Sequence, residues 1–558
     1  MGLPAAKQRS VLRQRIDQEH FDLTVIGGGI TGAGIALDAA SRGLSVALVE
    51  MKDFASGTSS KSTKLIHGGL RYLKQFEIQL VREVGRERAI VHRLAPHLVT
   101  SEKMLLPITE DGTYGKIGTS VGLKVYDFLA DVEGDDRRRM LDKEATLEKE
   151  PLLRADDLTG GGYYAEYRTD DARLTIEIIK QAAEYGAVSL NYVKAEGFTY
   201  DGEGQITGVN CRDLLDDTAF VINSTYVVSA AGPWVDTLRQ KDKSLEGKKL
   251  FLSKGVHIVV PHDRLPLHNA VYFDVPDGRM MFAIPRNRVT YIGTTDTPYR
   301  GDMDDIPAYV EDVQYILDGA NQAFPTAALT IDDVESHWAG LRPLIFEEGK
   351  SASEMSRKDE IFESPTGLLS IAGGKLTGYR KMAERIVDLV GERFERDHDR
   401  QIGDTKTTKI PLTDAPFNNP GEVDAYLARL EQEIAPLNLP DFYARYLLSN
   451  YGKVASRIVA NTDQYQHRGS EVALALAELD YCLAEELVFT PMDFYNRRTG
   501  RLYFAVTTIA PTRDAVLAHL TEYFGWDEAT QQRYANELDE ALYRAGHFEP
   551  APSDAVTA

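Results

Sequence analysis

Residues 21–50 read FDLTVIGGGITGAGIALDAASRGLSVALVE, and this stretch decides the fold. The apolar residues 21–26 predict a short buried strand, the small residues 30–42 predict a helix, and residues 45–50 predict a second strand. A strand, a helix and a strand in this order form a βαβ unit, which belongs to a parallel sheet with both faces covered. The stretch therefore predicts an α/β domain.

The turn between the first strand and the helix is a G-x-G-x-x-G motif made by Gly27, Gly29 and Gly32. In this motif the first glycine permits the tight turn, the second lets a pyrophosphate approach the backbone, and the third lets the helix pack closely on the sheet. Ile30 and Thr31 lie at the start of the helix, where the helix dipole favours a phosphate. The motif predicts a dinucleotide site.

Two features after the motif bear on which dinucleotide binds. Glu50 ends the second strand, about 18 residues after Gly32, where its carboxylate would accept hydrogen bonds from ribose hydroxyls. This acidic residue is equally compatible with NAD and with FAD. Residues 56–71, SGTSSKSTKLIHGGLR, follow directly and offer hydroxyls and glycine backbone that would line a flavin. A solvated Ser/Thr loop is the alternative interpretation of this run.

Two later segments repeat the pattern of a strand that ends in glycine. Residues 226–230 run into AGPW at 231–234, and residues 368–372 run into Gly373-Gly374 before an expected helix at 379–390. Because these pieces are widely separated in the sequence, we expect one nucleotide-binding domain that is assembled from discontinuous segments.

The remaining segments have a different character. Residues 250–295 alternate in β fashion around a Pro-Asp-Gly turn at 276–278, which predicts an antiparallel sheet that faces the substrate. A Pro-, Asn- and Thr-rich linker at 405–421 comes next. The segments beyond it carry apolar residues at three- and four-residue spacing and predict a helical C-terminal domain. These segments are 423–434, 440–450, 471–486 and 530–545.

The composition excludes several functional classes. The chain has 63 Lys and Arg against 85 Asp and Glu, and the formal net charge of −22 opposes binding to nucleic acid. Cys211 and Cys482 form no CxxC pair, which excludes a disulfide framework or a cysteine metal site and favours a reducing compartment. No HExxH, P-loop or G-x-S-x-G motif occurs, so metal catalysis is not indicated.

Residues 1–16 interleave basic and apolar side chains at helical spacing. A frayed or surface helix is the first interpretation, and a helix that lies on a membrane surface is the alternative. No apolar run in the chain approaches the roughly 20 residues of a membrane-spanning helix. The basic residues are Lys7, Arg9, Arg13 and Arg15, and the apolar residues among them are Val11, Leu12 and Ile16.

Seven motifs, in this order, closely resemble those of FAD-dependent glycerol-3-phosphate dehydrogenases. The similarity covers roughly residues 20–395. It implies non-covalent FAD, oxidation of sn-glycerol 3-phosphate to dihydroxyacetone phosphate, and passage of electrons to membrane quinone. It also implies a cytoplasmic protein that is peripherally associated with the inner face of the cell membrane, and it suggests a homodimer. The motifs are GGGITGAGIALDAASRGLSVALVE, TSSKSTKLIHGGLRYL, SAAGPWV, KGVHIVV, YIGTTDTPY, GLRPL and GGKLTGYRKMAE.

We therefore expect an α/β protein with a Rossmann-like FAD-binding domain, an antiparallel-sheet substrate domain and an all-helical C-terminal domain. The expected boundaries are 1–20 for an N-terminal amphipathic extension, 21–75, 155–250 and 340–395 for a discontinuous FAD-binding domain, 76–154 and 251–339 for the substrate-binding domain, and 405–558 for the helical domain.

The resemblance assigns FAD contacts to residues inside the matched motifs and close to them. These are Gly27, Gly29, Ile30, Thr31, Gly32, Glu50, Ser59, Ser60, Ser62, Lys64, Leu65, His67, Gly68, Gly69, Val193, Ala231, Gly232, Trp234, Gly374, Lys375, Leu376 and Thr377.

A small phosphorylated alcohol has to be held through its dianion, for which Arg and Lys are the suitable partners. Arg71, Arg342 and Lys375 are the candidates inside the motifs. Pro343 biases Arg342 away from helix and toward an extended strand end. Tyr72 and Arg357 are weaker candidates for substrate contact.

Oxidation at C2 also requires that the C2 hydroxyl lose its proton, so the site needs a base or a cation that acidifies the alcohol. His257, on one face of an alternating strand, and His67 are the two histidines inside matched motifs. Each is a candidate base, and otherwise a hydrogen-bonding wall residue. In either case Arg342 would stabilise the developing alkoxide.

Asp170 and Asp171, beside Arg168 and Arg173, resemble a pair of catalytic acids. An exposed charge cluster that opens a helix is the preferred interpretation.

Three other functions remain open at this point. The first is a glycerol-3-phosphate oxidase that passes electrons to oxygen and releases hydrogen peroxide. The second is an amino-acid or sarcosine-type oxidase on the same flavin scaffold, which would prefer a carboxylate–amine substrate. The third is a non-catalytic flavin-containing scaffold whose helical domain binds a partner.

Overall fold

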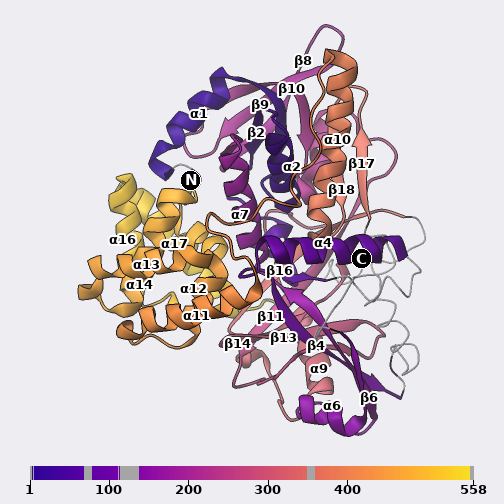
Figure 1. The fold of residues 1–558 in the computed structure, drawn as a ribbon, viewed down its shortest axis with the longest axis vertical. Helices are drawn as coiled ribbons and strands as arrows, with labels where there is room; N and C mark the ends of the chain where they lie inside the picture. The colour runs from indigo at the N-terminus through magenta and orange to yellow at the C-terminus, as the bar shows by residue number, and fades with distance from the viewer. Residues whose placement is uncertain are drawn as a thin grey trace.

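The computed structural model describes residues 3, 5–67, 78–110, 112, 137–347 and 358–552. Two β-sheets stack along the long axis of the molecule, and a helical C-terminal domain lies beside them (Figure 1). This arrangement confirms the predicted fold class.

The first sheet is the predicted dinucleotide-binding sheet. Its strands lie in the order β17-β18-β10-β1-β2-β7, and neighbours from β18 to β7 run parallel. The helices α2 (Ile30–Ser41), α7 (Asp171–Glu184) and α10 (Tyr379–His398) pack together beside it (Figure 1). The strands are β1 (His20–Ile26), β2 (Val46–Val49), β7 (Val188–Leu190), β8 (Val193–Tyr200), β9 (Ile206–Asp213), β10 (Ala219–Ser229), β17 (Asp359–Glu363) and β18 (Leu369–Gly373).

Parallel pairing brings the three glycine-ended strands to one edge of this sheet. β1 lies between β2 and β10, and β10 pairs with β18. The carboxyl ends of these strands therefore open at the same place, where ligands of α/β proteins bind.

The second sheet is mainly antiparallel. It runs β15-β11-β14-β13-β12-β4-β6-β3, with β16 on β11 and β5 on β6. Helix α9 (Val310–Ala323) packs on it. The strands are β3 (Leu65–Ile66), β4 (Thr100–Thr109), β5 (Arg139–Leu141), β6 (Leu158–Arg168), β11 (Leu250–Pro261), β12 (Ala270–Asp274), β13 (Met280–Arg286), β14 (Val289–Gly293), β15 (Thr297–Pro298) and β16 (Ser336–Ile345).

Strand β6 lies in a different sheet from the one that the expected domain boundary assigns to it. The boundary at residue 155 places it in the FAD-binding domain, whereas it pairs antiparallel with β4 in the second sheet. The sequence of β6, LTGGGYYAEYR, is rich in glycine and carries no sign of its partner. Because strand pairing is non-local, the sequence of β6 alone does not show to which of the two domains the strand belongs.

The N-terminal helix α1 (Arg9–Gln18) is anchored in the protein. Leu12 and Ile16 are buried, and Arg9 forms a buried ion pair with Asp213. The helix packs on β7 and β10. The alternative of a membrane-surface helix is therefore wrong for Leu12 and Ile16, because an amphipathic pattern fits a protein surface as well as a lipid one, whereas Val11 is exposed.

The C-terminal domain is helical, as predicted. Among the described residues, no helix combines the length and the apolar character needed to cross a bilayer. The linker at 405–421 leads into α11 (Pro420–Ile434), α12 (Phe442–Tyr451), α13 (Ala455–Asn461), α14 (Ser470–Glu485), a π-helix (Asp493–Arg498), α15 (Arg501–Phe504), α16 (Arg513–Phe524) and α17 (Glu528–Gly546). The remaining helices are α4 (Ile78–Leu94), α6 (Lys143–Lys149) and α8 (Val235–Lys241).

Candidate active site

A cavity of about 500 Å³ opens where β1, β10 and β18 end. Its walls come from all three glycine-ended strands, so the discontinuous segments do meet at one site. The predicted cofactor residues that line it are Gly27, Gly29, Ile30, Thr31, Glu50, Ser59, Ser62, Val193, Ala231, Gly232, Trp234, Gly374, Lys375 and Leu376.

The glycine turn forms a cradle that larger residues would fill. Gly27 has φ +113°, a conformation that residues with a side chain rarely adopt. A Cβ added to Gly32 would lie 1.9 Å from the carbonyl oxygen of Gly27, so helix α2 packs directly on the turn. At the start of α2, the backbone N–H of Ile30 donates to Ser59 Oγ at 2.9 Å. This turn fits the pyrophosphate of a dinucleotide.

Glu50 supplies a buried acceptor beside the turn. Its Oε2 accepts from the backbone N–H of Gly28 at 2.7 Å, and its Oε1 accepts from the N–H of Lys52 at 3.0 Å. Burial raises the pKa of Glu50, and the two N–H bonds oppose that rise. A carboxyl group fixed in this way has lone pairs left for ribose hydroxyls. The cradle and this acceptor together fit FAD.

Replacing Glu50 with glutamine is expected to raise the Kd for FAD about tenfold, or about 1.4 kcal/mol. The glutamine amide offers one oxygen where the structure uses two, so one backbone N–H loses its acceptor. Titration of flavin-free protein with FAD, followed by fluorescence, measures the change. Glu196→Gln is the control, since Glu196 is an exposed residue of β8 that pairs with Arg212 on β9. Equal Kd values for the two variants would contradict the role given to Glu50.

Two glycines of the second sheet leave space for the side chains of Arg342 and His257. A Cβ on Gly255 would lie 2.3 Å from Nη2 of Arg342, and a Cβ on Gly293 would lie 2.3 Å from Cδ2 of His257. Gly255 and His257 alternate along β11 and share one face of the sheet. The two glycines therefore let the side chains of Arg342 and His257 lie along the sheet. Both predicted site residues are thus on one surface.

Arg342 is held from one side by a single loop. Its guanidinium donates to the Thr295 carbonyl at 3.1 Å, to Asp296 Oδ1 at 3.3 Å and to Thr294 Oγ1 at 2.9 Å. Its chain neighbour Pro343 lines the cavity. Arg342 thus has a fixed side chain and precedes a cavity-lining residue in the chain.

His257 is buried and neutral. Burial lowers its pKa well below the ordinary value, and the positive charges of Arg342 and Lys64 lower it further. Its ring stacks on Trp338 at 4.8 Å, and its Nε2 lies 3.0 Å from Oγ1 of Thr63. Thr63 follows Ser62, which lines the cavity, so His257 contacts the segment that forms the wall.

Some predicted residues do not line the cavity. Lys64 is buried in an ion pair with Asp171. The carbonyl of His67 accepts from Thr377 Oγ1 at 3.3 Å, which joins two predicted segments through their backbone and a hydroxyl. The others outside the lining are Gly32, Ser60, Leu65, Thr377, His257 and Arg342. Gly68, Gly69, Arg71, Tyr72 and Arg357 lie outside the described residues.

Asp170 and Asp171 are not the exposed cluster that we expected. Both are buried, and Lys64 and Arg286 balance their charges. Asp170 caps α7 by accepting from the N–H of Arg173. The helix start was legible in the sequence, but the distant cations that allow the two acids to be buried were not.

The cavity also has walls that the sequence analysis missed. Thr58 and Gly57 lie inside the Ser/Thr-rich run, which had been considered as a whole. Residues 302–304, from the second sheet's side, carry no motif and could be placed only by the fold.

Comparison with known proteins finds two family models. A model described as "FAD dependent oxidoreductase" matches residues 22–380, and one described as "C-terminal domain of alpha-glycerophosphate oxidase" matches residues 405–531.

Two relatives match almost the whole chain. The aerobic glycerol-3-phosphate dehydrogenase of Bacillus subtilis (strain 168) is 48% identical over 542 residues, which cover 96% of this chain and 97% of the relative. The protein of the same name from Staphylococcus aureus (strain MRSA252) is 47% identical over 550 residues, 98% of each chain.

Solved structures agree with these matches. Glycerol-3-phosphate dehydrogenase from Bacillus halodurans complexed with FAD has a TM-score of 0.82 at 45% identity and covers 97% of this chain and 98% of that chain. Glycine oxidase from Geobacillus kaustophilus has a TM-score of 0.52 at 20% identity, covers 71% of this chain and 100% of that chain, and shares the fold.

Proposed function

The chain belongs to the FAD dependent oxidoreductase family and, within it, to the aerobic glycerol-3-phosphate dehydrogenases, and we propose on this basis that it oxidises sn-glycerol 3-phosphate to dihydroxyacetone phosphate. FAD is its cofactor. The observation that carries the proposal is the fixed guanidinium of Arg342 beside neutral His257, on two strands whose nearest cavity-lining residues are Pro343, next to Arg342 in the chain, and Ser62, next to the His257 contact Thr63.

Cations adjacent to the cavity bind the substrate in this proposal. Arg342 is held in place by Thr294, Thr295 and Asp296, and Lys375 lines the cavity just after the third glycine turn. A phosphate dianion is a good partner for both groups because their hydrogen bonds to it are charge-assisted. Binding through the phosphate orients the C2 carbon.

FAD, when bound, supplies the acceptor for the hydride that leaves C2. The C2 hydroxyl loses its proton in the same oxidation, and His257 accepts it, because the neutral imidazole has a free lone pair. Loss of the hydride from C2 and of the proton from its hydroxyl leaves the neutral C2 carbonyl of the product. Arg342 stabilises the negative charge that develops on the oxygen.

The lowered pKa of His257 predicts the pH dependence of this step. Since the neutral form persists as the pH falls past about 6.5, flavin reduction at saturating substrate should stay flat from about pH 8 to about pH 6. Anaerobic stopped-flow absorbance over a pH series measures it, with His257→Asn as the reference. A loss of rate near pH 6.5 that is absent from His257→Asn would show that His257 is charged, contrary to this prediction.

We propose membrane quinone as the electron acceptor. Anaerobic mixing of the purified protein with glycerol 3-phosphate should bleach the flavin, and a soluble quinone should reoxidise it faster than oxygen does. Faster reoxidation by oxygen would make the protein an oxidase. Absence of bleaching would refute the substrate, and bleaching by glycine derivatives instead would identify an amino-acid oxidase.

A quinone acceptor requires contact with the bilayer, which supports a cytoplasmic protein bound peripherally at the inner face of the membrane. Because Leu12 and Ile16 of α1 are buried, we expect another surface to make most of this contact. Co-sedimentation with phosphatidylcholine vesicles tests the association. We also propose a homodimer, which light scattering after gel filtration would reveal by its mass.

A further inference from the structure

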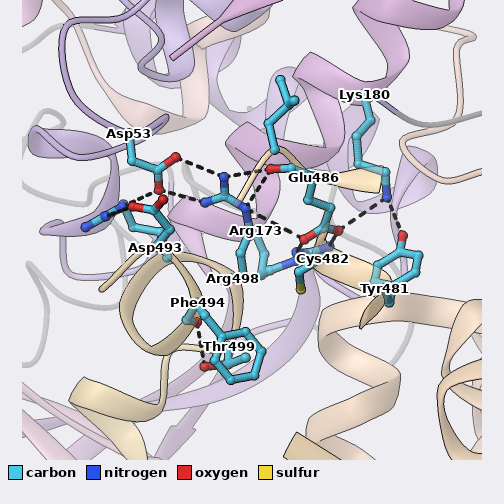
Figure 2. Close-up of polar contacts among 12 residues, drawn as sticks. Asp53, Arg173, Lys180, Tyr481, Cys482, Glu486, Asp493, Phe494, Arg498 and Thr499 are labelled. Carbon is cyan, nitrogen blue, oxygen red and sulfur yellow. Dashed lines mark hydrogen bonds and ion pairs between the residues drawn. The ribbon is translucent and has the colours of Figure 1, made fainter. Parts of the chain in front are cut away.

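A cluster of buried charges joins the helical C-terminal domain to the dinucleotide-binding domain (Figure 2). At its centre is Asp53, which is 1% exposed. Its carboxylate accepts from Arg497 Nε at 2.5 Å, from Arg498 at 2.8 and 2.9 Å, and from Asn191 Nδ2 at 2.9 Å. Arg498 and Arg497 lower the pKa of Asp53 against the effect of its burial. Asp53 is therefore an ionised carboxylate that two arginines of another domain hold.

The two arginines come from an unusual turn. Residues Asp493–Arg498 form a π-helix, a conformation found mostly as single turns at functional sites. The wider turn allows the adjacent residues Arg497 and Arg498 to reach the same carboxylate. Figure 2 shows Arg498 between Asp53 and Glu486, whose carbonyl accepts from Arg498 Nη2 at 2.8 Å.

Other bonds hold this turn in place. Asp493 accepts from Arg497 at 2.7 Å and from the hydroxyl of Tyr192 at 2.6 Å. The side chain of Glu486 forms two bonds, of 2.8 and 2.9 Å, with Arg173 on α7. Arg497 and Arg498 are thus held in place by groups other than Asp53.

Asp53 belongs to the loop that wraps around the glycine turn. Only two residues separate it from Glu50, whose carboxylate binds the N–H of Gly28. The N–H of Ala55 donates to the Gly28 carbonyl at 3.0 Å. A Cβ on Gly28 would lie 2.7 Å from the ring of Phe54, so the loop contacts the N–H, the carbonyl and the α-carbon of Gly28. Moving Asp53 would move the groups on either side of it.

We propose that Arg497 and Arg498 are positioning residues for FAD, and that the helical domain forms part of the cofactor site by fixing residues 50–55 against the glycine turn. The inference rests on the FAD site of the proposed function but is independent of the substrate. Its test uses no substrate, so it fails or holds separately from the assignment of glycerol 3-phosphate.

The test measures the release of FAD from Arg498→Lys holoenzyme after dilution, followed by the fluorescence of freed flavin. Lysine keeps the positive charge but cannot span both oxygens of Asp53. We expect release at least tenfold faster than from the unaltered protein. Arg501→Lys is the matched control, because Arg501 and Glu478 are an equally buried pair that lies wholly inside the helical domain. Arg501→Lys should lower the Tm by about as much as Arg498→Lys does, and it should change the rate of FAD release less than threefold.

Equal acceleration in both variants, or none in Arg498→Lys, would overturn the proposal. If Arg498→Lys does not fold, Arg497→Lys takes its place, since it removes one bond to Asp53 at a partly exposed position. Asp53→Asn combined with either variant should give no more than the larger single effect on release, because both changes act on one contact. Additive effects would show that the arginines act elsewhere.

Discussion

Arg342→Ala is expected to slow reduction of the flavin by glycerol 3-phosphate at least tenfold and to raise KM. Together these effects should lower kcat/KM about a hundredfold, or about 2.7 kcal/mol. Thr294, Thr295 and Asp296 hold the side chain in one position, so the alanine variant loses a positive charge that these contacts fix. Stopped-flow and steady-state kinetics measure the two parts separately.

The control for this experiment is Arg288→Ala. Arg288 lies in the turn between β13 and β14 of the second sheet, where it forms a two-bond pair with Glu335, at 2.7 and 2.8 Å, and it does not line the cavity. Its loss should leave both constants within about twofold, in line with the small effects of surface pairs. Normal single-turnover reduction in Arg342→Ala would remove Arg342 from the mechanism.

Gly32→Ala is expected to yield protein that retains no FAD. The new Cβ would lie 1.9 Å from the carbonyl oxygen of Gly27, a backbone atom that has no freedom to turn away. Helix α2 must shift, which displaces the turn and costs about 3 kcal/mol of stability or more. The ratio of flavin to protein absorbance gives the retention, and urea unfolding gives the stability.

Gly403→Ala provides the comparison, since a Cβ at Gly403 would meet no atom within 4 Å and its backbone is not in the left-handed region. It should retain FAD fully. Full flavin content in Gly32→Ala would mean that the helix accommodates the methyl group. That result would contradict the packing role given to Gly32.

Local pattern was sufficient for the parts of the fold that depend on neighbouring residues. The strand, glycine turn and helix at 21–42 form β1 and α2 as predicted, because periodicity and turn chemistry act over a few residues. The glycine ends of β10 and β18 were found in the same way. Glu50 followed from its distance to the motif.

Distant partners explain what the sequence did not reveal. Asp171 is buried because Lys64 meets it, and Asp53 is buried because Arg498, 445 positions away, reaches it. A charged side chain has no local sign that it will be paired, and the default expectation for it is solvent. The same reason explains why the neighbour of β6 could not be predicted.

The order of strands in the first sheet also affects how the protein is made. β1 leaves the ribosome well before its partner β10, which ends at residue 229, and before β18, next to β10, which ends at residue 373. At common rates of translation the wait is on the order of tens of seconds. During that time the apolar strand next to the glycine turn has an open edge, so the nascent chain is a natural client for a chaperone that shields such edges.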